Sequence, residues 1–136
     1  MINMAQFATS PNADLMAAVQ TYFDALYHCD VVRFDQVFHP SASLFDADEG
    51  RIFVDPIAGY RDTIFHRDSP AQAKAPRQDE VLSIDALSDV AATVKVRLRI
   101  HDNVFLDHLM FAKDGSAWRI VAKLWSLQEQ PEMAPG

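Results

Sequence analysis

The sequence has 136 residues, 49% of them apolar, so the chain is most simply one domain with a packed core, not a disordered segment. Lys and Arg number 12 against 19 Asp and Glu, and this net charge of −7 argues against nucleic acid or an anionic membrane as a partner. No stretch approaches the roughly 20 apolar residues of a membrane span, and residues 1–5 lack the pattern of a signal peptide. We therefore expect a cytoplasmic protein, in which the single cysteine, Cys29, excludes an internal disulfide.

The first half of the chain is predicted to contain three helices. Ser10-Pro11 starts the first, because serine is a favoured N-cap and proline is tolerated in the first turn. Its core face consists of side chains at helical spacing, namely Leu15, Val19, Tyr22 and Leu26. Asp30 can cap a second, short helix, which His39-Pro40 ends because the residue before a proline disfavours helical geometry. Asp55-Pro56 repeats the cap-and-proline pattern and predicts a third helix to about Arg67.

Strands are expected between the last two helices and throughout the second half. A short strand at residues 43–45 leads into an acidic turn at residues 46–50, followed by an extended stretch at 51–54. After a loop at residues 68–78 the apolar period changes to two, which predicts strands at 81–87, 92–100, 104–113 and 117–127. Asp114-Gly115 is a strong hairpin turn, so these strands should form an antiparallel meander under the helices. The predicted class is α+β, with one domain at 10–128 and flexible termini at 1–9 and 129–136.

Asp107 is the most informative residue, because it interrupts an almost wholly apolar strand. It shares a strand face with Phe105, Leu109 and Phe111, a setting that would raise the pKa of a buried carboxyl group. Such acids gather at functional sites, although structural networks also contain them, so Asp107 is either a pocket residue or a structural acid. Alternation turns the neighbouring His108 to the opposite face, where it can serve a dimer interface.

Two sequence patches resemble the nuclear transport factor 2-like superfamily. The first comprises residues 19–26 with Phe38-His39-Pro40, and the second comprises Asp107-His108-Leu109 with residues 113–115 and 118–123. The residues of the second patch, together with Phe38-His39-Pro40, are most similar to the lumazine-binding-like branch of this superfamily. The resemblance covers residues 12–127 and implies a cone-shaped fold, in which three N-terminal helices and a curved, mainly antiparallel sheet enclose a pocket. It also implies a homodimer formed through the sheet.

Three residues of this sequence resemble the active site of ketosteroid isomerases. Tyr22, Asp46 and Asp107 fall where those enzymes carry a helix tyrosine, a base aspartate and a strand aspartate. The resemblance implies that Asp46 removes a proton α to a carbonyl, while Tyr22 and a protonated Asp107 donate hydrogen bonds to the enolate oxygen, a mechanism known for that enzyme and carried over here. Read from the residues alone, Tyr22 can equally be a core tyrosine. Asp46 can be a turn carboxylate like its neighbours Asp48 and Glu49, either of which can also be the pocket acid.

The expected ligand is a small apolar or ring-containing molecule. Its contacts are predicted to be aromatic and aliphatic side chains, namely Phe38, Phe65, Phe105, Leu109, Phe111 and Trp125. His39, His101 and His108 have no zinc-like spacing, and no phosphate loop or dinucleotide fingerprint is present, so no metal or cofactor is expected.

Three functions remain open from the sequence. The favoured one is a small-molecule-binding domain with an apolar pocket and no catalysis. The first alternative is an isomerase-like or dehydratase-like enzyme that transfers a proton α to a carbonyl through Tyr22, Asp46 and Asp107. The second is a homodimeric accessory module without a ligand.

Overall fold

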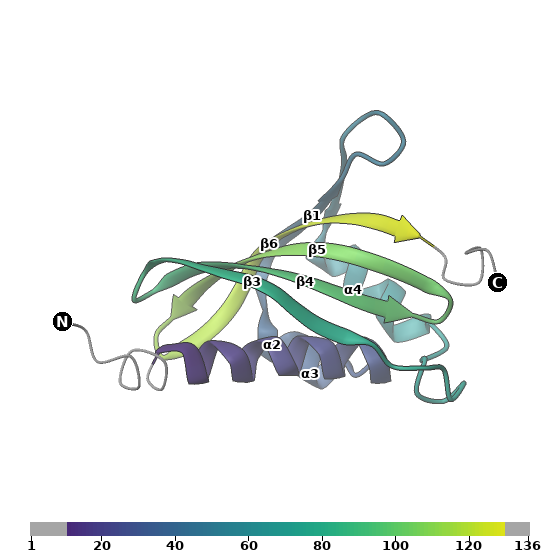
Figure 1. The fold of residues 1–136 in the computed structure, drawn as a ribbon, viewed down its shortest axis with the longest axis horizontal. Coiled ribbons are helices and arrows are strands. Elements are labelled where there is room, and N and C mark those ends of the chain that lie inside the picture. Colours follow the sequence, from purple (N-terminus) through teal and green to yellow (C-terminus); the bar gives the residue numbers. More distant parts are fainter. Residues whose placement is uncertain (1–10, 130–136) are drawn as a thin grey trace.

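The first two helices pack as a pair beneath the sheet. The computed structural model describes residues 11–129, so the predicted N-cap Ser10 and most of the predicted flexible termini lie outside the described residues. Helix α2 spans Pro11–His28 and α3 spans Val31–Val37 (Figure 1). The predicted Asp30 cap is confirmed, because its carboxylate accepts hydrogen bonds from the backbone N–H groups at 32 and 33, at 3.0 and 3.3 Å.

The second helix ends earlier than the sequence predicted. It stops at Val37, and strand β1 (Phe38–Asp46) already contains His39 and Pro40. Proline lacks the N–H that a strand ladder needs. The strand accommodates Pro40 because the pairing of β1 with β6 is irregular at that point, between Phe38 and Ser43. The short strand expected at 43–45 is therefore the regular end of a longer one.

The third helix is present, but the predicted cap is wrong. Helix α4 spans Ile57–His66, while Asp55 and Pro56 are the last residues of strand β2 (Phe53–Pro56). Pro56 occupies the N-cap position, and no side chain caps the helix there. Asp55 instead turns towards the first turn of α4, so closely that a Cβ added at Gly59 would lie 2.8 Å from its Oδ1.

The sheet is mixed and confirms the predicted α+β class. Strands β3 (Asp79–Ser88), β4 (Ala91–Ile100), β5 (Asn103–Asp114) and β6 (Ala117–Glu129) form the predicted antiparallel meander. Within residues 11–129 the sheet has the order β2-β1-β6-β5-β4-β3, and β1 pairs with β6 in parallel. Since α4 follows β1 and β2, the three described helices do not form one N-terminal block, which corrects that detail of the prediction.

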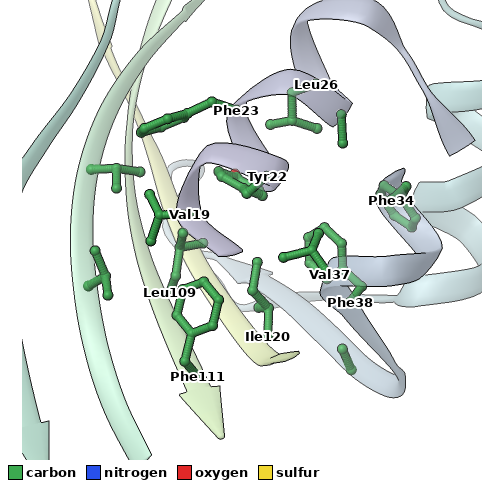
Figure 2. Close-up of a cluster of buried hydrophobic side chains, with 14 of the residues drawn as sticks. Val19, Tyr22, Phe23, Leu26, Phe34, Val37, Phe38, Leu109, Phe111 and Ile120 are labelled. Atoms are coloured by element: carbon green, nitrogen blue, oxygen red, sulfur yellow. The ribbon is translucent and has the colours of Figure 1, made fainter. Parts of the chain in front are cut away.

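The core lies between α2 and the inner face of the sheet. The predicted core face of α2 is confirmed, because all four side chains are at most 2% exposed: Leu15, Val19, Tyr22 and Leu26. They face buried side chains of β5 and β6 such as Leu109 and Ile120 (Figure 2). Helix α4 covers the inner face nearer β1, so that α2 and α4 together flank the centre of the sheet.

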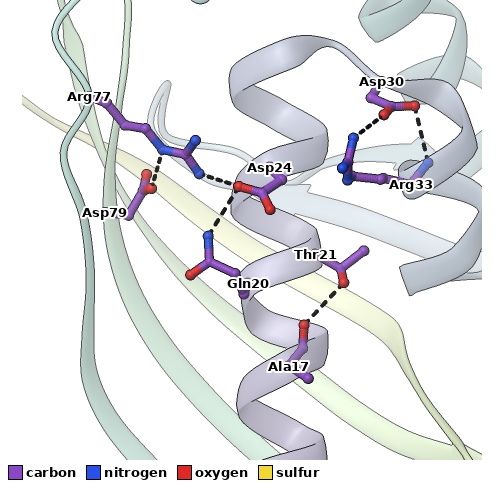
Figure 3. A network of polar contacts seen from close by, with 8 residues as sticks. All are labelled: Ala17, Gln20, Thr21, Asp24, Asp30, Arg33, Arg77 and Asp79. Atoms are coloured by element: carbon purple, nitrogen blue, oxygen red, sulfur yellow. Dashed lines mark hydrogen bonds and ion pairs between the residues drawn. The ribbon is translucent and has the colours of Figure 1, made fainter.

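An arginine fixes the long loop that follows α4. The Nη2 atom of Arg77 lies 2.5 Å from Asp24 on α2, and its Nε lies 2.6 Å from Asp79 at the start of β3 (Figure 3). The guanidinium also lies 4.7 Å from the centre of the Tyr27 ring. These contacts attach the C-terminal end of loop 67–78, which connects α4 to β3, to helix α2.

Candidate functional site

A cavity of about 230 Å³ lies between α4 and the inner face of the sheet. Its apolar lining comes from α2, β1, β4, β5 and β6, through Leu26, Leu44, Leu98, Ile100, Phe105 and Trp125. Its polar lining comes from β2, α4, β5 and β6, through Asp55, Tyr60, Thr63, Arg67, Asp107 and Lys123. The wall is thus mostly apolar and includes several ionisable residues, as in ligand-binding cavities.

Asp107 lies at the centre of a buried polar cluster. Its residue is 2% exposed, and the Tyr22 hydroxyl donates a hydrogen bond to Oδ2. The ammonium of Lys123 lies 3.5 Å from the same oxygen, so the carboxylate has a buried counter-charge. No described residue donates to the other oxygen, Oδ1, although it is also buried. Asp107 therefore keeps one unsatisfied acceptor, buried beside the cavity.

Lys123 completes the cluster. It is 5% exposed, and its Nζ donates to the Tyr60 hydroxyl at 3.4 Å. The same Nζ lies 4.9 Å from the centre of the Tyr60 ring and 5.3 Å from that of Tyr22. Burial lowers the pKa of Lys123. The nearby Asp107 and Tyr60 raise it by more than burial lowers it, so the pKa lies above its usual value. Lys123 is consequently a cation at neutral pH.

Tyr22 is a neutral hydrogen-bond donor. Burial raises its pKa well above the ordinary value, and the negative charge of Asp107 raises it further. The phenol therefore keeps its proton and directs it at the carboxylate of Asp107. Because its ring is fully buried, Tyr22 contributes to the site through Asp107 and does not itself line the cavity.

A β-bulge turns Lys123 inward. Across the β5–β6 ladder Phe111 pairs with Ile120, whereas Met110 pairs with Ala122, so Val121 is an extra residue on β6. An extra residue reverses the alternation of side chains beyond it. Ile120 and Lys123 therefore both point to the inner face, three positions apart, and Lys123 meets Asp107 there.

The structure brings two of the three predicted catalytic residues into contact. Tyr22 and Asp107 are hydrogen-bonded, but Asp46 ends β1 opposite Phe53 and does not line the cavity. Asp48, the alternative acid, accepts hydrogen bonds from Ser126 Oγ at 2.6 Å and from the backbone at 127, which leaves it outside the cavity. The carboxylate that lines the cavity from this region is Asp55, because it pairs across from Leu44.

Two of the predicted ligand contacts line the cavity, and one is exposed and does not line it. Phe105 and Trp125 form adjacent walls, with ring centres 5.7 Å apart. Phe65 is 63% exposed, because the neighbouring Ile64 occupies the inward position on α4. The other three, which do not line the cavity, are buried in the core: Phe38, Leu109 and Phe111.

Tyr60, Arg67 and Lys123 were not anticipated from the sequence. Tyr60 and Arg67 lie at helical spacing from the buried Ile57 and Ile64. Their inward position could therefore be predicted from the apolar face of α4. Lys123 carries no such signal, since simple alternation from Ile120 would point it outward.

The fold and this site can be compared with known proteins. Residues 10–126 match the family described as "Putative lumazine-binding". The chain belongs to this family. No curated protein matches the sequence.

Several solved structures share the fold, which confirms the resemblance to the nuclear transport factor 2-like superfamily. An NTF2-like protein of unknown function from Silicibacter pomeroyi has a TM-score of 0.76 at 20% identity, covering 93% of this chain and 100% of its own. An NTF2-like protein from Shewanella baltica has a TM-score of 0.77 at 18% identity, covering 96% and 99%. A ketosteroid isomerase-like protein from Erwinia carotovora has a TM-score of 0.65 at 13% identity, covering 86% and 95%. These likenesses concern the fold, because it hosts many activities.

Two further findings concern the described part of the chain. None of its helices is long and apolar enough to cross a membrane. Nor does it bring three or more His, Cys, Asp or Glu side chains together as a group that could hold a metal ion.

Replacing Lys123 by methionine should destabilise the fold by about 3 kcal/mol, because the Asp107 carboxylate stays buried without its counter-charge. The double variant with Asp107→Asn should recover part of the lost stability. No unpaired charge remains in it, and the amide oxygen can still accept a hydrogen bond from Tyr22. Urea unfolding at pH 7 measures both effects. Lys95→Met is the matched control, exposed on β4, and should change stability by less than about 0.5 kcal/mol.

The same measurement at alkaline pH tests the state of Lys123. Its pKa is raised in the folded protein, so its stabilisation is complete below the usual lysine pKa of 10.5 and is lost as pH rises through the raised pKa. The wild-type protein should therefore lose stability above about pH 10 more steeply than Lys123→Met. Equal slopes for the two proteins would contradict a buried, charged Lys123.

Proposed function

We propose that this protein binds a small, ring-containing and largely apolar molecule in the cavity beside Asp107. The observation that supports this is a predominantly apolar cavity that lies beside a buried ion pair. Mostly apolar cavities with a few polar groups in the wall are typical of small-molecule sites. In this proposal the helices and the curved sheet enclose the ligand as in a cone.

The size of the cavity restricts the ligand. A cavity of about 150 Å³ in another protein accommodates benzene. The present volume of about 230 Å³ thus has room for a single substituted ring. Phe105 and Trp125 provide flat aromatic walls for such a ring.

Filling the cavity should abolish binding of a simple ring compound. Leu98 is buried and lines the cavity, so Leu98→Phe places extra carbon atoms in the space that the ligand would occupy. Calorimetric titration with benzyl alcohol should show binding to the wild-type protein and at least about tenfold weaker binding to this variant. Leu124→Phe makes the same substitution at a position 56% exposed and should bind as the wild type does.

Failure of benzyl alcohol and other single-ring alcohols to bind the wild-type protein would refute the proposal. So would equal binding to Leu98→Phe, since the ligand would then lie elsewhere. Thermal unfolding of each variant without ligand checks that the substituted proteins are folded.

A proton-transfer enzyme is the second candidate, supported by the contact between Tyr22 and Asp107. In this proposal Asp55, the carboxylate at the cavity mouth, removes a proton from the carbon α to a carbonyl and returns it at the γ carbon, so that the double bond moves into conjugation. Lys123 and Tyr60 donate hydrogen bonds to the oxygen of the intermediate enolate. The reaction is an isomerisation and needs no further reactant.

Cyclohex-3-en-1-one, a single-ring β,γ-unsaturated ketone, tests this candidate. Its conversion to cyclohex-2-en-1-one raises ultraviolet absorbance and can be followed directly. If the protein is such an enzyme, Asp55→Asn should lower turnover by at least about a hundredfold, whereas Asp46→Asn should leave it nearly unchanged. Turnover no faster than in buffer would remove this candidate and leave the binding proposal intact.

We further propose a homodimer formed through the outer face of the sheet. That face carries apolar side chains on β5 and β6 that are well exposed in the described chain, with Met110 at 49% and Leu124 at 56%. The exposed His108 lies directly across from Leu124, on the side opposite Asp107, as expected from alternation. An exposed apolar patch on a sheet favours association of two copies.

Light scattering after size-exclusion chromatography should give twice the mass of the chain. Leu124→Glu should shift the protein towards the monomer, because a carboxylate would be buried in the interface. Leu87→Glu, at a position 71% exposed near the β3–β4 turn, should leave the mass unchanged. A monomeric wild-type protein at micromolar concentration would contradict the dimer.

A further inference from the structure

Two residues mark the mouth of the cavity. Among the residues that line it, Asp55 and Thr63 are exposed, whereas all the others are buried or half-buried. Asp55 belongs to strand β2 and Thr63 to helix α4, so the cavity opens between these two elements. A ligand that fills the cavity therefore meets polar groups of β2 and α4 where it borders on solvent.

The direction of the Asp55 side chain is defined by two contacts. Asp55 pairs directly with Leu44, which is 2% exposed and lines the cavity. Directly opposite residues of paired strands turn their side chains to the same face, so Asp55 also points to the inner face of the sheet. Its carboxylate lies against the first turn of α4, because a Cβ added at Gly59 would be 2.8 Å from Oδ1. The next residue of the helix, Tyr60, lines the cavity as well.

The Asp55 carboxylate has a charge that the fold does not neutralise. No hydrogen bond or ion pair from residues 11–129 reaches it, whereas the other carboxylate of the lining, Asp107, is paired with Lys123. Because Asp55 is exposed, water hydrates it in the free protein. A ligand that covers the mouth displaces this water and must replace its hydrogen bonds, or the charge is left without a partner.

Thr63 adds a second acceptor at the mouth. Its hydroxyl donates a hydrogen bond to the carbonyl oxygen of Gly59 at 3.2 Å, one turn earlier in α4. A hydroxyl has one proton, so the Thr63 oxygen can then only accept, and a carboxylate also only accepts. An ammonium group is the complement of such a mouth, since it has three donors, a positive charge and no acceptor.

We propose that the ligand is a single-ring amine whose ammonium group binds the Asp55 carboxylate between β2 and α4. Its ring contacts the aromatic walls Phe105 and Trp125 deeper in the cavity. This inference rests on the proposed binding function and names the chemical class of its ligand. In the proton-transfer candidate the same carboxylate is the base, so the inference belongs to the binding function alone.

Matched pairs of ligands test the charge without altering the protein. Benzylamine and benzyl alcohol have the same ring and chain, and only the amine is a cation at pH 7. The pair 2-phenylethylamine and 2-phenylethanol has a longer chain, because the reach from ring to carboxylate matters. In calorimetric titration of the wild-type protein, the amine of the better pair should bind at least about threefold more tightly than its alcohol.

A substitution at Asp55 tests which carboxylate binds the amine. Asp55→Asn should weaken amine binding at least about threefold and leave alcohol binding unchanged, since only the amine carries the charge. Asp62→Asn is the matched control on α4, where the side chain is 76% exposed and lies outside the cavity. It removes the same charge, so it separates binding at Asp55 from attraction of a cation by the net charge of −7.

A substitution at Gly59 tests the placement of the carboxylate. A methyl group there would force the Asp55 carboxylate away from α4, whereas alanine itself is favoured in a helix. Gly59→Ala should therefore weaken amine binding at least about twofold and leave alcohol binding unchanged. Thermal unfolding without ligand checks that each variant is folded. The ligand comparison in the wild-type protein needs no variant at all.

The outcomes separate this inference from the binding function. Equal affinity for amine and alcohol in both pairs, tighter binding of benzoate than of benzylamine, or equal effects of Asp55→Asn and Asp62→Asn would each overturn the ligand class. An unchanged preference for the amine in Gly59→Ala would overturn the placement of the ammonium between β2 and α4. If benzyl alcohol still binds the wild-type protein but not Leu98→Phe, the binding function stands and only the class is wrong. If no single-ring compound binds at all, both fail together.

Discussion

The buried pair of Asp107 and Lys123 is the constraint on which the rest of the site depends. Removing two charges from water is costly, and an ion pair in the interior compensates only when further polar contacts satisfy the charged groups. Here the Tyr22 hydroxyl satisfies one carboxylate oxygen, and the Tyr60 hydroxyl and two aromatic rings surround the ammonium. The pair therefore joins α2, α4, β5 and β6 at one point.

The extra residue in β6 makes this pair possible. A strand that continued its alternation from Ile120 would direct Lys123 to the outer face and Leu124 to the inner face. Asp107 would then be a buried carboxylate with only a tyrosine as partner, and the cavity would gain a leucine. The bulge at Val121 exchanges those two side chains. A local irregularity in the ladder thus determines whether the cavity wall is charged.

The residues that the sequence predicted are positioned by local periodicity, whereas the residues that it missed are positioned by contacts between distant segments or by an irregular strand. Tyr22 and Asp107 follow from periodicity within one helix and one strand, so both were placed correctly at the interior. The inward direction of the Lys123 side chain depends on a β-bulge, which no local sequence pattern predicts. Asp55 was interpreted as a helix cap because Asp-Pro commonly starts helices, whereas pairing with β1 keeps it in a strand. The parallel pairing of β1 with β6 joins segments about 80 residues apart, and only the folded chain brings them together.

Phe65 illustrates a second difference between the sequence pattern and the structure. Aromatic residues were assigned to the pocket by their type, although the direction of a helical side chain is set by its position relative to the buried face. Ile57, Tyr60, Ile64 and Arg67 define that face of α4, and Phe65 lies outside it. Helical spacing from Ile57 and Ile64 places Tyr60 and Arg67 on this face and Phe65 off it.

The ion pair also limits the chemistry that the cavity can support. An enolate oxygen develops negative charge, and a neighbouring carboxylate would oppose that charge. Asp107 is paired with an ammonium and accepts a hydrogen bond from Tyr22, so its carboxylate is a poor neighbour for an oxyanion. The groups that can stabilise such a charge are Lys123 and Tyr60, on the α4 side of the cluster. Any proton transfer in this cavity would therefore place the carbonyl oxygen against Lys123 and not against Asp107. The fold is shared with a ketosteroid isomerase-like protein, and in this chain the strand aspartate is paired with a buried lysine.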